Sequence, residues 1–147
     1  MKLPLIDGKS MLKAVVDTSV FIAGLIKDST CRRVLKALQE SQFTLVVSSE
    51  TFEEFLEVIS RRKFHHIIDH SVASRLVKVI QSQAILVKPS VRVINVVDDP
   101  DDNCFLEAAL EGQVDCMVSV DNHLLSLDSF RNIPILRPAQ FLALLKK

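Results

Sequence analysis

Short apolar runs alternate with stretches of helical periodicity along almost the whole sequence, and this alternation restricts the fold more than any other feature. The runs are rich in β-branched residues and apolar throughout, which is typical of strands covered on both faces of a parallel sheet. We predict strands at 12–16, 43–47, 84–87, 116–120 and 133–136. Helical segments fill the intervals. The expected fold is therefore an α/β fold, a three-layer α/β/α sandwich with a mostly parallel sheet of about five strands.

Capping residues and helical periodicity place the helices. We predict helices at 20–26, 30–40, 49–62, 69–82, from the acidic turn 98–102 to 111, at 122–127 and at 138–145. Thr18 and Ser19 are expected to cap the first helix, and Ser29 is expected to open the second. Gly112 is expected to close the helix after the acidic turn, because glycine tolerates the left-handed conformation found at helix ends. The segment 91–97 is compatible with either a strand or an extended loop.

The length of 147 residues suits one domain. Residues 1–10 are poorly patterned and Met11 could be a natural start, so we interpret 1–10 as a tag or extension and 11–147 as a single domain. No apolar run approaches the roughly 20 residues of a membrane span, and the N-terminus lacks a secretory segment. The three cysteines are far apart, which is typical of a reducing compartment. These features predict a cytoplasmic protein.

The 18 basic and 18 acidic residues give a net charge of zero, so bulk charge does not indicate a strongly basic nucleic-acid-binding protein. The charges are nevertheless unevenly distributed. Acidic residues gather at 50–57 and 98–102, and basic residues gather at 32–36, 61–63 and 75–78. A neutral total can therefore conceal an acidic pocket that is flanked by basic surface.

Four acidic residues occupy positions that a parallel sheet would bring to one edge. Asp17 follows the first predicted strand and Asp121 follows the fourth, and ligands bind beyond the carboxyl ends of parallel strands. Glu54 lies within the helix that follows the second strand, and Asp102 lies in the first turn of the helix before the fourth strand. All four side chains can therefore reach the same edge.

Carboxylates gathered in this way repel one another, by about 4 kcal/mol per pair at a separation of 4 Å and a surface-like dielectric constant. Such a cluster needs either protons or a cation. A set of carboxylate oxygens without histidine or cysteine favours a hard ion, which indicates Mg²⁺ or Mn²⁺. One or two such ions can activate a water molecule and stabilise the leaving oxygen in phosphodiester cleavage.

Each of these acids also has a purely structural interpretation. Asp17 and Asp121 each precede a predicted helix, where aspartate commonly caps the first turn. Glu54 stands in an acidic helical stretch whose members are usually solvated. Asp102 falls at the capping-box position of a helix start that has Asp99 as its N-cap. Neighbouring acids compete for the same roles: Glu53 and Glu57 with Glu54, and Asp99 and Asp101 with Asp102.

Four segments resemble, in their order and spacing, the motifs of the PIN-domain family, and the resemblance covers about 12–145. They read VVDTSVFIAGL at 15–25, SSETFEEFLEVISRRKF at 48–64, DDPDDNCFLEAAL at 98–110 and VDCMVSVDNHLLSL at 114–127. The subgroup resembled is that of the VapC-like ribonucleases, the toxins of toxin–antitoxin systems. The resemblance implies a mostly parallel sheet with helices on both sides, Mg²⁺- or Mn²⁺-dependent endoribonuclease activity, an RNA substrate, a cognate antitoxin and a homodimer.

The resemblance also assigns the site residues. The motif acids, which would hold the metal and carry the catalysis, fall on Asp17, Glu54, Asp102 and Asp121. Ser19 and Ser119 occupy the polar positions expected to support these acids, and Ser19 is favoured over Thr18 as the residue that faces the metal.

Basic residues after the second motif are candidate contacts to RNA phosphates, namely Arg61, Arg62 and Lys63. A basic helix end that interacts favourably with the helix dipole is their more ordinary explanation. The histidines His65, His66 and His123 show no metal-ligand spacing, so we expect surface or packing roles for them.

An alternative function is a catalytically silent binding module that acts through an antitoxin or through self-association. Retention of all four acids argues against a degenerate site. A phosphatase is disfavoured because the sequence after Asp17 lacks the second aspartate, two residues on, that an aspartyl-phosphate enzyme uses. The sequence contains no GxxxxGK[ST] phosphate loop, which disfavours a nucleoside triphosphatase.

Overall fold

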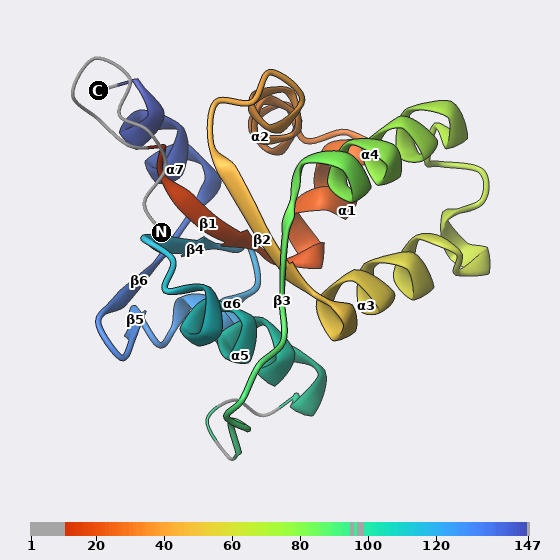
Figure 1. Cartoon of the computed structure of the whole chain (residues 1–147). Helices are drawn as coiled ribbons and strands as arrows, with labels where there is room; N and C mark the ends of the chain where they lie inside the picture. The colour runs from red at the N-terminus through yellow and green to blue at the C-terminus, as the bar shows by residue number, and fades with distance from the viewer. Residues whose placement is uncertain (1–10, 95, 97–98, 147) are drawn as a thin grey trace.

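A computed structural model of the chain describes residues 11–94, 96 and 99–146. The expected N-terminal extension at 1–10 therefore lies outside the described residues. Strands and helices alternate in the order that the sequence predicts (Figure 1). None of the described helices is both long enough and apolar enough to cross a membrane.

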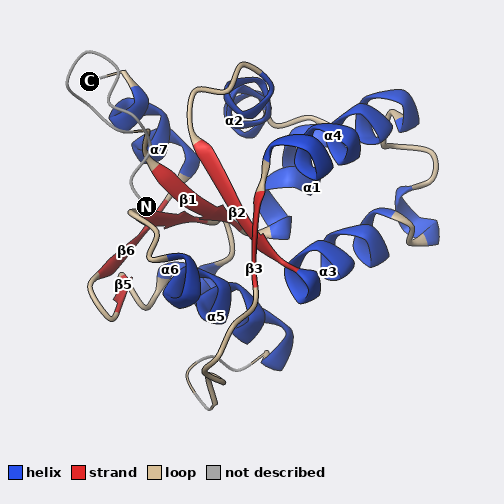
Figure 2. Cartoon of the chain, viewed as in Figure 1, coloured by secondary structure: helices blue, strands red, loops and turns tan. Residues whose placement is uncertain are grey.

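Within the described residues, six strands form one sheet in the order β3-β2-β1-β4-β6-β5. Their bounds are β1 Lys13–Val16, β2 Thr44–Ser48, β3 Ile85–Val87, β4 Cys116–Val118, β5 Ser129–Phe130 and β6 Ile133–Leu136. Neighbouring strands are parallel, except that β5 is antiparallel to β6. The mostly parallel α/β fold is thus confirmed (Figure 2). The extra strand is β5, whose two residues are too short to show a period-two pattern in sequence.

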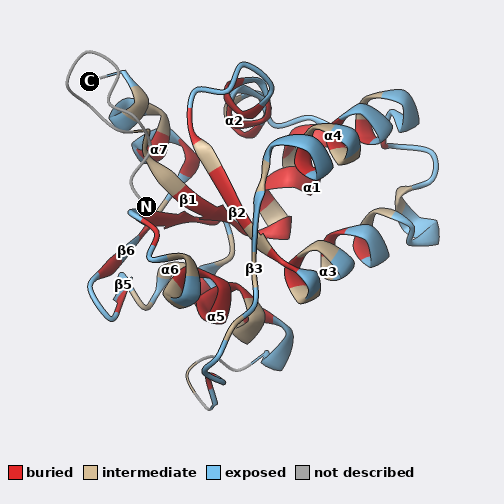
Figure 3. Cartoon of the chain, in the orientation of Figure 1, coloured by how far each residue is buried: buried red, intermediate tan, exposed pale blue. Residues whose placement is uncertain are grey.

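Helices cover both faces of the sheet. On one face lie α1 (Thr18–Ile26), α2 (Ser29–Gln39), α3 (Ser49–Ile59), α4 (His70–Gln83) and α7 (Pro138–Leu145). On the other face lie α5 (Asn103–Gly112) and α6 (Asn122–Leu125). Each face has its own hydrophobic core, and β1 serves both: Ala14 and Val16 join the first core, and Val15 joins the second. Figure 3 shows this burial along the central strands β1, β2 and β4 and on the inner faces of the helices, whereas the edge strand β3 is largely exposed.

The third helix is shorter than its sequence pattern predicts. It ends at Ile59 instead of continuing to 62, and the chain then forms a 3₁₀ turn, η1, at Arg62–Phe64. Ser60 explains the early end, because its hydroxyl donates to the carbonyl of Glu57 at 2.7 Å. Such local side-chain bonds compete with continuation of the helix.

Aspartates, and not hydroxyl residues, stand at the N-caps of the first two helices. The prediction that Thr18 and Ser19 cap α1 is wrong, because both lie inside the helix and Asp17 is its N-cap residue. Ser29 is the first residue of α2, and the carboxylate of Asp28 caps this helix by accepting a backbone N–H of the first turn. A carboxylate suits this position because it also faces the positive end of the helix dipole. Asp17 makes no such bond, so its carboxylate is available for other partners.

Gly112 is the last residue of α5, but the left-handed conformation falls one residue later, on Gln113 with φ 49°. The glycine is required for a different reason. A Cβ atom at Gly112 would lie 2.7 Å from Cγ1 of Val46, a buried residue of β2. Close packing of α5 on the sheet therefore explains the glycine.

The crossover from β3 to the second 3₁₀ turn, η2 (Pro100–Asp102), contains the segment 91–97. Its described residues, 91–94 and 96, form no strand, so the extended-loop alternative holds for them, and the remainder lies outside the described residues. Two carboxylates of α5 accept backbone N–H groups of this crossover, which in a sheet would be accepted by the carbonyls of a neighbouring strand. Glu111 accepts the N–H of Ser90 and Glu107 accepts the N–H of Val93, both at 2.8 Å.

The end of α5 yields a pair of opposite predictions. Gly112→Ala should lower the free energy of unfolding by about 1–3 kcal/mol, because the added methyl group overlaps a stiff, buried valine. Gln113→Gly should raise it by about 1 kcal/mol, because glycine adopts positive φ without steric cost. Denaturant-induced unfolding of the two variants checks both signs. Stabilisation by Gly112→Ala would contradict the packing explanation.

Candidate functional site

Asp17 stands at the carboxyl end of β1 with a side chain that is only 3% exposed. Its Oδ2 atom accepts hydrogen bonds from the hydroxyls of Ser19 at 2.7 Å and Ser119 at 2.8 Å. Burial raises the pKa of Asp17, the two serine hydroxyls oppose that shift, and the charge of Asp121 adds to it. The two hydroxyls therefore hold a buried carboxylate in a defined orientation.

Ser119 and Ser19 tie together the ends of β1 and β4. Ser119 is fully buried, and its hydroxyl also accepts the N–H of Asp121 at 2.9 Å. The Ser19 hydroxyl accepts the N–H of Val120 at 3.4 Å. Each serine thus donates to Asp17 and accepts from the loop that follows β4, so the positions of Asp17 and Asp121 are linked.

Asp121 follows β4 and is the N-cap residue of α6. Its Oδ1 atom accepts the N–H of His123 at 2.8 Å, so the structural interpretation of this aspartate as a cap is correct. Its charge nevertheless raises the pKa values of both Asp17 and Asp102. Asp121 therefore caps α6 and also lies near the other acids of the site.

Glu54 reaches the same edge from α3. Its Oε2 atom accepts a short hydrogen bond from the hydroxyl of Thr18, the residue that follows Asp17. Burial raises the pKa of Glu54, the Thr18 bond opposes this shift, and the charges of Asp17 and Asp101 add to it. The sequence resemblance predicts Ser19 in preference to Thr18 at the site. In the structure the hydroxyl of Thr18 donates to Glu54, and the hydroxyl of Ser19 donates to Asp17. The position of Thr18 next to Asp17 is the sequence signal that points to its role in the site.

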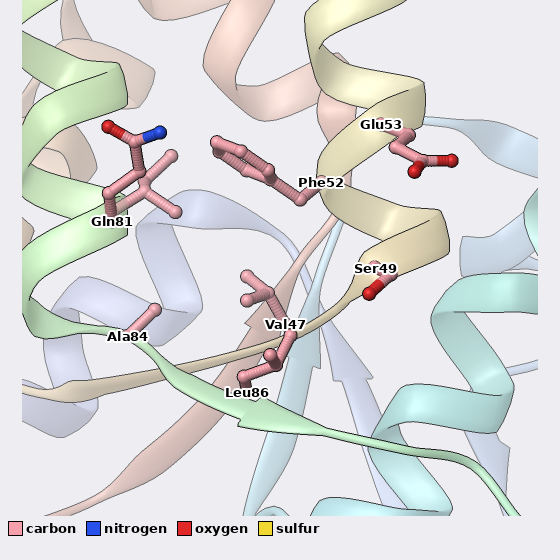
Figure 4. A pocket seen from close by; sticks show the side chains of 8 residues that line it. Val47, Ser49, Phe52, Glu53, Gln81, Ala84 and Leu86 are labelled. Carbon is pink, nitrogen blue, oxygen red and sulfur yellow. The ribbon is translucent and has the colours of Figure 1, made fainter.

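The acids that compete with Glu54 point elsewhere. Glu57 is exposed and pairs with Arg61 at 2.8 Å, one turn further along the chain. Glu53 is exposed and lines a groove of about 280 Å³ between α3, α4 and β3. Figure 4 shows this groove, whose walls are mainly apolar and include Phe52 and Leu86. The geometry therefore selects Glu54 from the acidic run of α3.

Asp102 lies at the end of η2 with a side chain that is 8% exposed, whereas Asp99 and Asp101 are exposed. Asp99 is the N-cap of η2, as predicted, and accepts the N–H of Asp101 at 3.0 Å. Asp102 makes no capping bond, and its buried Oδ2 atom has no hydrogen-bond partner within the described part of the chain. Burial raises the pKa of Asp102 to about 7, with further contributions from Asp17, Asp121, Asp99 and Glu54.

The structure thus brings the four predicted acids to one edge of the sheet, where the charges of Asp17, Asp121 and Glu54 add to the effect of burial on the pKa of Asp102. The arrangement is open: among the described residues, no three acids, histidines or cysteines stand close enough to form a complete metal-binding group. The donor set still fits a hard divalent cation, because it consists of oxygens and includes the unpartnered, buried Oδ2 of Asp102. Such a cation would relieve the repulsion among the carboxylates.

The predicted basic residues lie on the surface beyond α3. Arg61 precedes η1, and Arg62 and Lys63 lie within it, and all three are exposed. The bond to Glu57 raises the pKa of Arg61, and the charges of Glu54 and Asp101 add to this shift, so the guanidinium stands near the acidic edge. His65 contacts the carbonyl of Ser60 at 3.2 Å, which agrees with a packing role.

The charge state of Asp102 gives a pH-dependent prediction. In the folded protein its pKa is about 7, against an ordinary value of 3.8. The folded state therefore binds an extra proton between these values, and the stability contributed by Asp102 is lost as the pH rises from about 4 to about 7. In the presence of EDTA, Asp102→Asn should melt several degrees above the wild type at pH 8, since about 4 °C corresponds to 1 kcal/mol. The gap should shrink as the pH falls below about 7 and close at about pH 4.

Asp101→Asn is the matched control, because this neighbouring aspartate is exposed. Its melting temperature should differ from that of the wild type by less, with no step near pH 7. A gap between Asp102→Asn and the wild type that stays constant from pH 5 to pH 8 would disprove the assignment of a protonated, buried carboxyl.

Comparison with known proteins agrees with this geometry. A family model described as "PIN domain" matches residues 13–123. The crystal structure of PAE2754 from Pyrobaculum aerophilum aligns with a TM-score of 0.62 at 17% identity, over 92% of this chain and 90% of that one. VapBC2 from Rickettsia felis, solved bound to a DNA fragment from its promoter, aligns with a TM-score of 0.56 at 12% identity, over 86% and 98%. No curated protein sequence matches. The family match spans most of the chain, which therefore belongs to the PIN-domain family.

Proposed function

We propose that this PIN-domain protein is an Mg²⁺- or Mn²⁺-dependent endoribonuclease, the toxin of a VapC-like toxin–antitoxin pair. One observation carries the proposal: four acids converge at the carboxyl edge of the sheet, and the buried Oδ2 of Asp102 among them lacks a hydrogen-bond partner within the described residues. PIN domains are generally nucleases, which supports phosphodiester hydrolysis as the reaction class. The nuclease domain would comprise residues 11–147.

In this proposal Asp17, Asp102, Asp121 and Glu54 hold the cation. Ser19 and Ser119 orient the Asp17 carboxylate through their two bonds to Oδ2, and Thr18 orients Glu54. A bound cation would supply the Lewis acidity that activates a water molecule and offsets the charge of the scissile phosphate. Asp102 must lose its proton to bind a cation, so cation affinity should rise with pH up to about 7.

The charges around the site suit an RNA substrate if the basic residues receive its flanking phosphates. Acidic side chains alone repel a polyanion, and Arg61 stands near the acidic edge. Arg62 and Lys63 continue the basic surface in η1. These three residues are the proposed contacts to RNA phosphates.

The partners and the location proposed for this chain are inferred from its similarity to known proteins. The VapBC2 structure from Rickettsia felis contains a toxin–antitoxin pair with promoter DNA, which supports a cognate antitoxin for this chain. We also propose that the protein is cytoplasmic and forms a homodimer. Co-purification with the product of a neighbouring gene, and a dimer mass in sedimentation at micromolar concentration, are the expected results.

Cleavage of total cellular RNA tests the activity. Wild-type protein with Mn²⁺ should cleave, and Asp17→Asn should lose about 100-fold or more of the rate, since it removes a central ligand. Removal of the cation by EDTA should have the same effect. Equal cleavage by wild type and Asp17→Asn would rule out a metal nuclease at this site.

Two adjacent glutamates of α3 give a matched pair for the assignment of Glu54. Glu54→Gln should reduce cleavage by at least about 10-fold, because it removes a charge from the acidic edge. Glu53→Gln changes the same charge on the exposed groove and should leave the rate within about twofold. Reversal of this order would transfer the role to Glu53. An inactive wild type that still binds its antitoxin tightly would instead support the silent binding module.

A further inference from the structure

The two acids that come from helices, Glu54 and Asp102, belong to different layers of the sandwich. Helix α3 packs in the core on one face of the sheet, and α5 packs in the core on the other face. The two residues nevertheless lie near each other beyond the strand ends: burial is the main cause of the raised pKa of Asp102, and the charge of Glu54 adds to it. The spacing of α3 and α5 therefore sets the separation of these two acids.

The boundary between α3 and α5 is crowded with negative charge. Cys104 of α5 lies within it, and burial raises the pKa of its thiol to about 12, with contributions from Glu54, Glu107, Glu50 and Asp101 in that order. Two of these acids come from α3, and two come from η2 and α5. Left alone, this repulsion would push the two helices apart.

One arginine spans the boundary. Nη1 of Arg92, in the crossover after β3, lies 3.3 Å from Oε2 of Glu50 on α3 and 3.3 Å from Oε1 of Glu107 on α5. Glu107 is buried, and its other oxygen accepts the N–H of Val93 at 2.8 Å. The same network thus joins α3, α5 and the crossover.

The anchors of this network stand close to the acids of the site. Glu50 precedes Glu54 by one helical turn, and Glu107 follows Asp102 by five residues on the continuous η2–α5 segment. A shift of either anchor therefore moves an acid of the site with it.

We propose that Arg92 is a positioning residue, an electrostatic clamp between Glu50 and Glu107 that holds α3 against α5 and so sets the separation of Glu54 and Asp102 for cation binding. This inference rests on the proposed metal-dependent function. Loss of the clamp should change the separation of the two acids more than the free energy of unfolding. The Arg92 side chain is 73% exposed, and exposed ion pairs contribute little to stability.

The sign of a charge substitution separates a clamp from simple electrostatics. Arg92→Gln removes a positive charge near a cation site, so long-range electrostatics alone would tighten cation binding. A clamp predicts the opposite, since loss of Arg92 lets the two acidic helices separate. Both contacts use a single nitrogen, so the ammonium of Arg92→Lys can replace it in part.

The experiment is a calorimetric titration of the full chain with Mn²⁺ at pH 8. We expect Arg92→Gln to raise the Mn²⁺ dissociation constant about 5- to 10-fold, Arg92→Lys to recover part of the loss, and Arg33→Gln to match the wild type. Arg33 is an exposed arginine of α2, remote from this boundary. The unfolding midpoint of Arg92→Gln in EDTA should stay close to that of the wild type.

The outcomes separate the clamp from the proposed function. Wild-type Mn²⁺ binding with an unchanged or tighter dissociation constant in Arg92→Gln overturns the clamp and leaves the metal site intact. Equal weakening in Arg92→Gln and Arg92→Lys, with a lowered unfolding midpoint in EDTA, also overturns it in favour of a structural role. Absence of Mn²⁺ binding by the wild type at millimolar concentration overturns the proposed function and the clamp together.

Discussion

Parallel pairing of β1 with β4 is the constraint on which the site depends. The register places Val16 beside Val118, so the residues that follow the two strands emerge side by side. Asp17 extends this pairing by donating its N–H to the carbonyl of Val118 at 2.9 Å. Ser119 then reaches Asp17 with its hydroxyl, and its position fixes the loop that carries Asp121. A slip by one residue would turn these side chains to the opposite faces and disperse the acids.

Within the described residues, three kinds of interaction offset the repulsion among the carboxylates of the site. Hydroxyls of Ser19 and Ser119 bind Asp17, and the hydroxyl of Thr18 binds Glu54. Asp102 has no such donor at Oδ2, and burial raises its pKa, which favours the protonated form of this side chain. Further out, Arg61 pairs with the exposed Glu57, and Arg92 pairs with Glu50 and with the buried Glu107. Asp102 is therefore the acid of the site that a bound cation would stabilise most.

Site residues that adjoin a strand can be assigned from the sequence, whereas site residues on a helix cannot be told from their neighbours. The positions of Asp17 and Asp121 followed from the ends of two apolar runs. Glu54 could not be separated from Glu53 by the same reasoning, because adjacent helical residues differ by about 100° in direction and the direction depends on packing. The prediction for the cap of α1 is wrong because hydroxyl and carboxylate side chains compete for the same position. The sequence left strand and loop open for 91–94, because the N–H of Val93 bonds to the carboxylate of Glu107, a contact that local periodicity does not reveal.

The amino-acid sequence by itself determined the order of strands and helices, the parallel α/β architecture and the acids that close the strands. These properties follow from local periodicity and from the direction of the chain, which a sequence displays directly. Only the tertiary structure decided which acid of each crowded run turns inward, which hydroxyl serves which carboxylate, and that Arg92 joins α3 to α5. Those choices depend on contacts between residues far apart in the chain, where burial and the mutual charges of neighbours outweigh local preference.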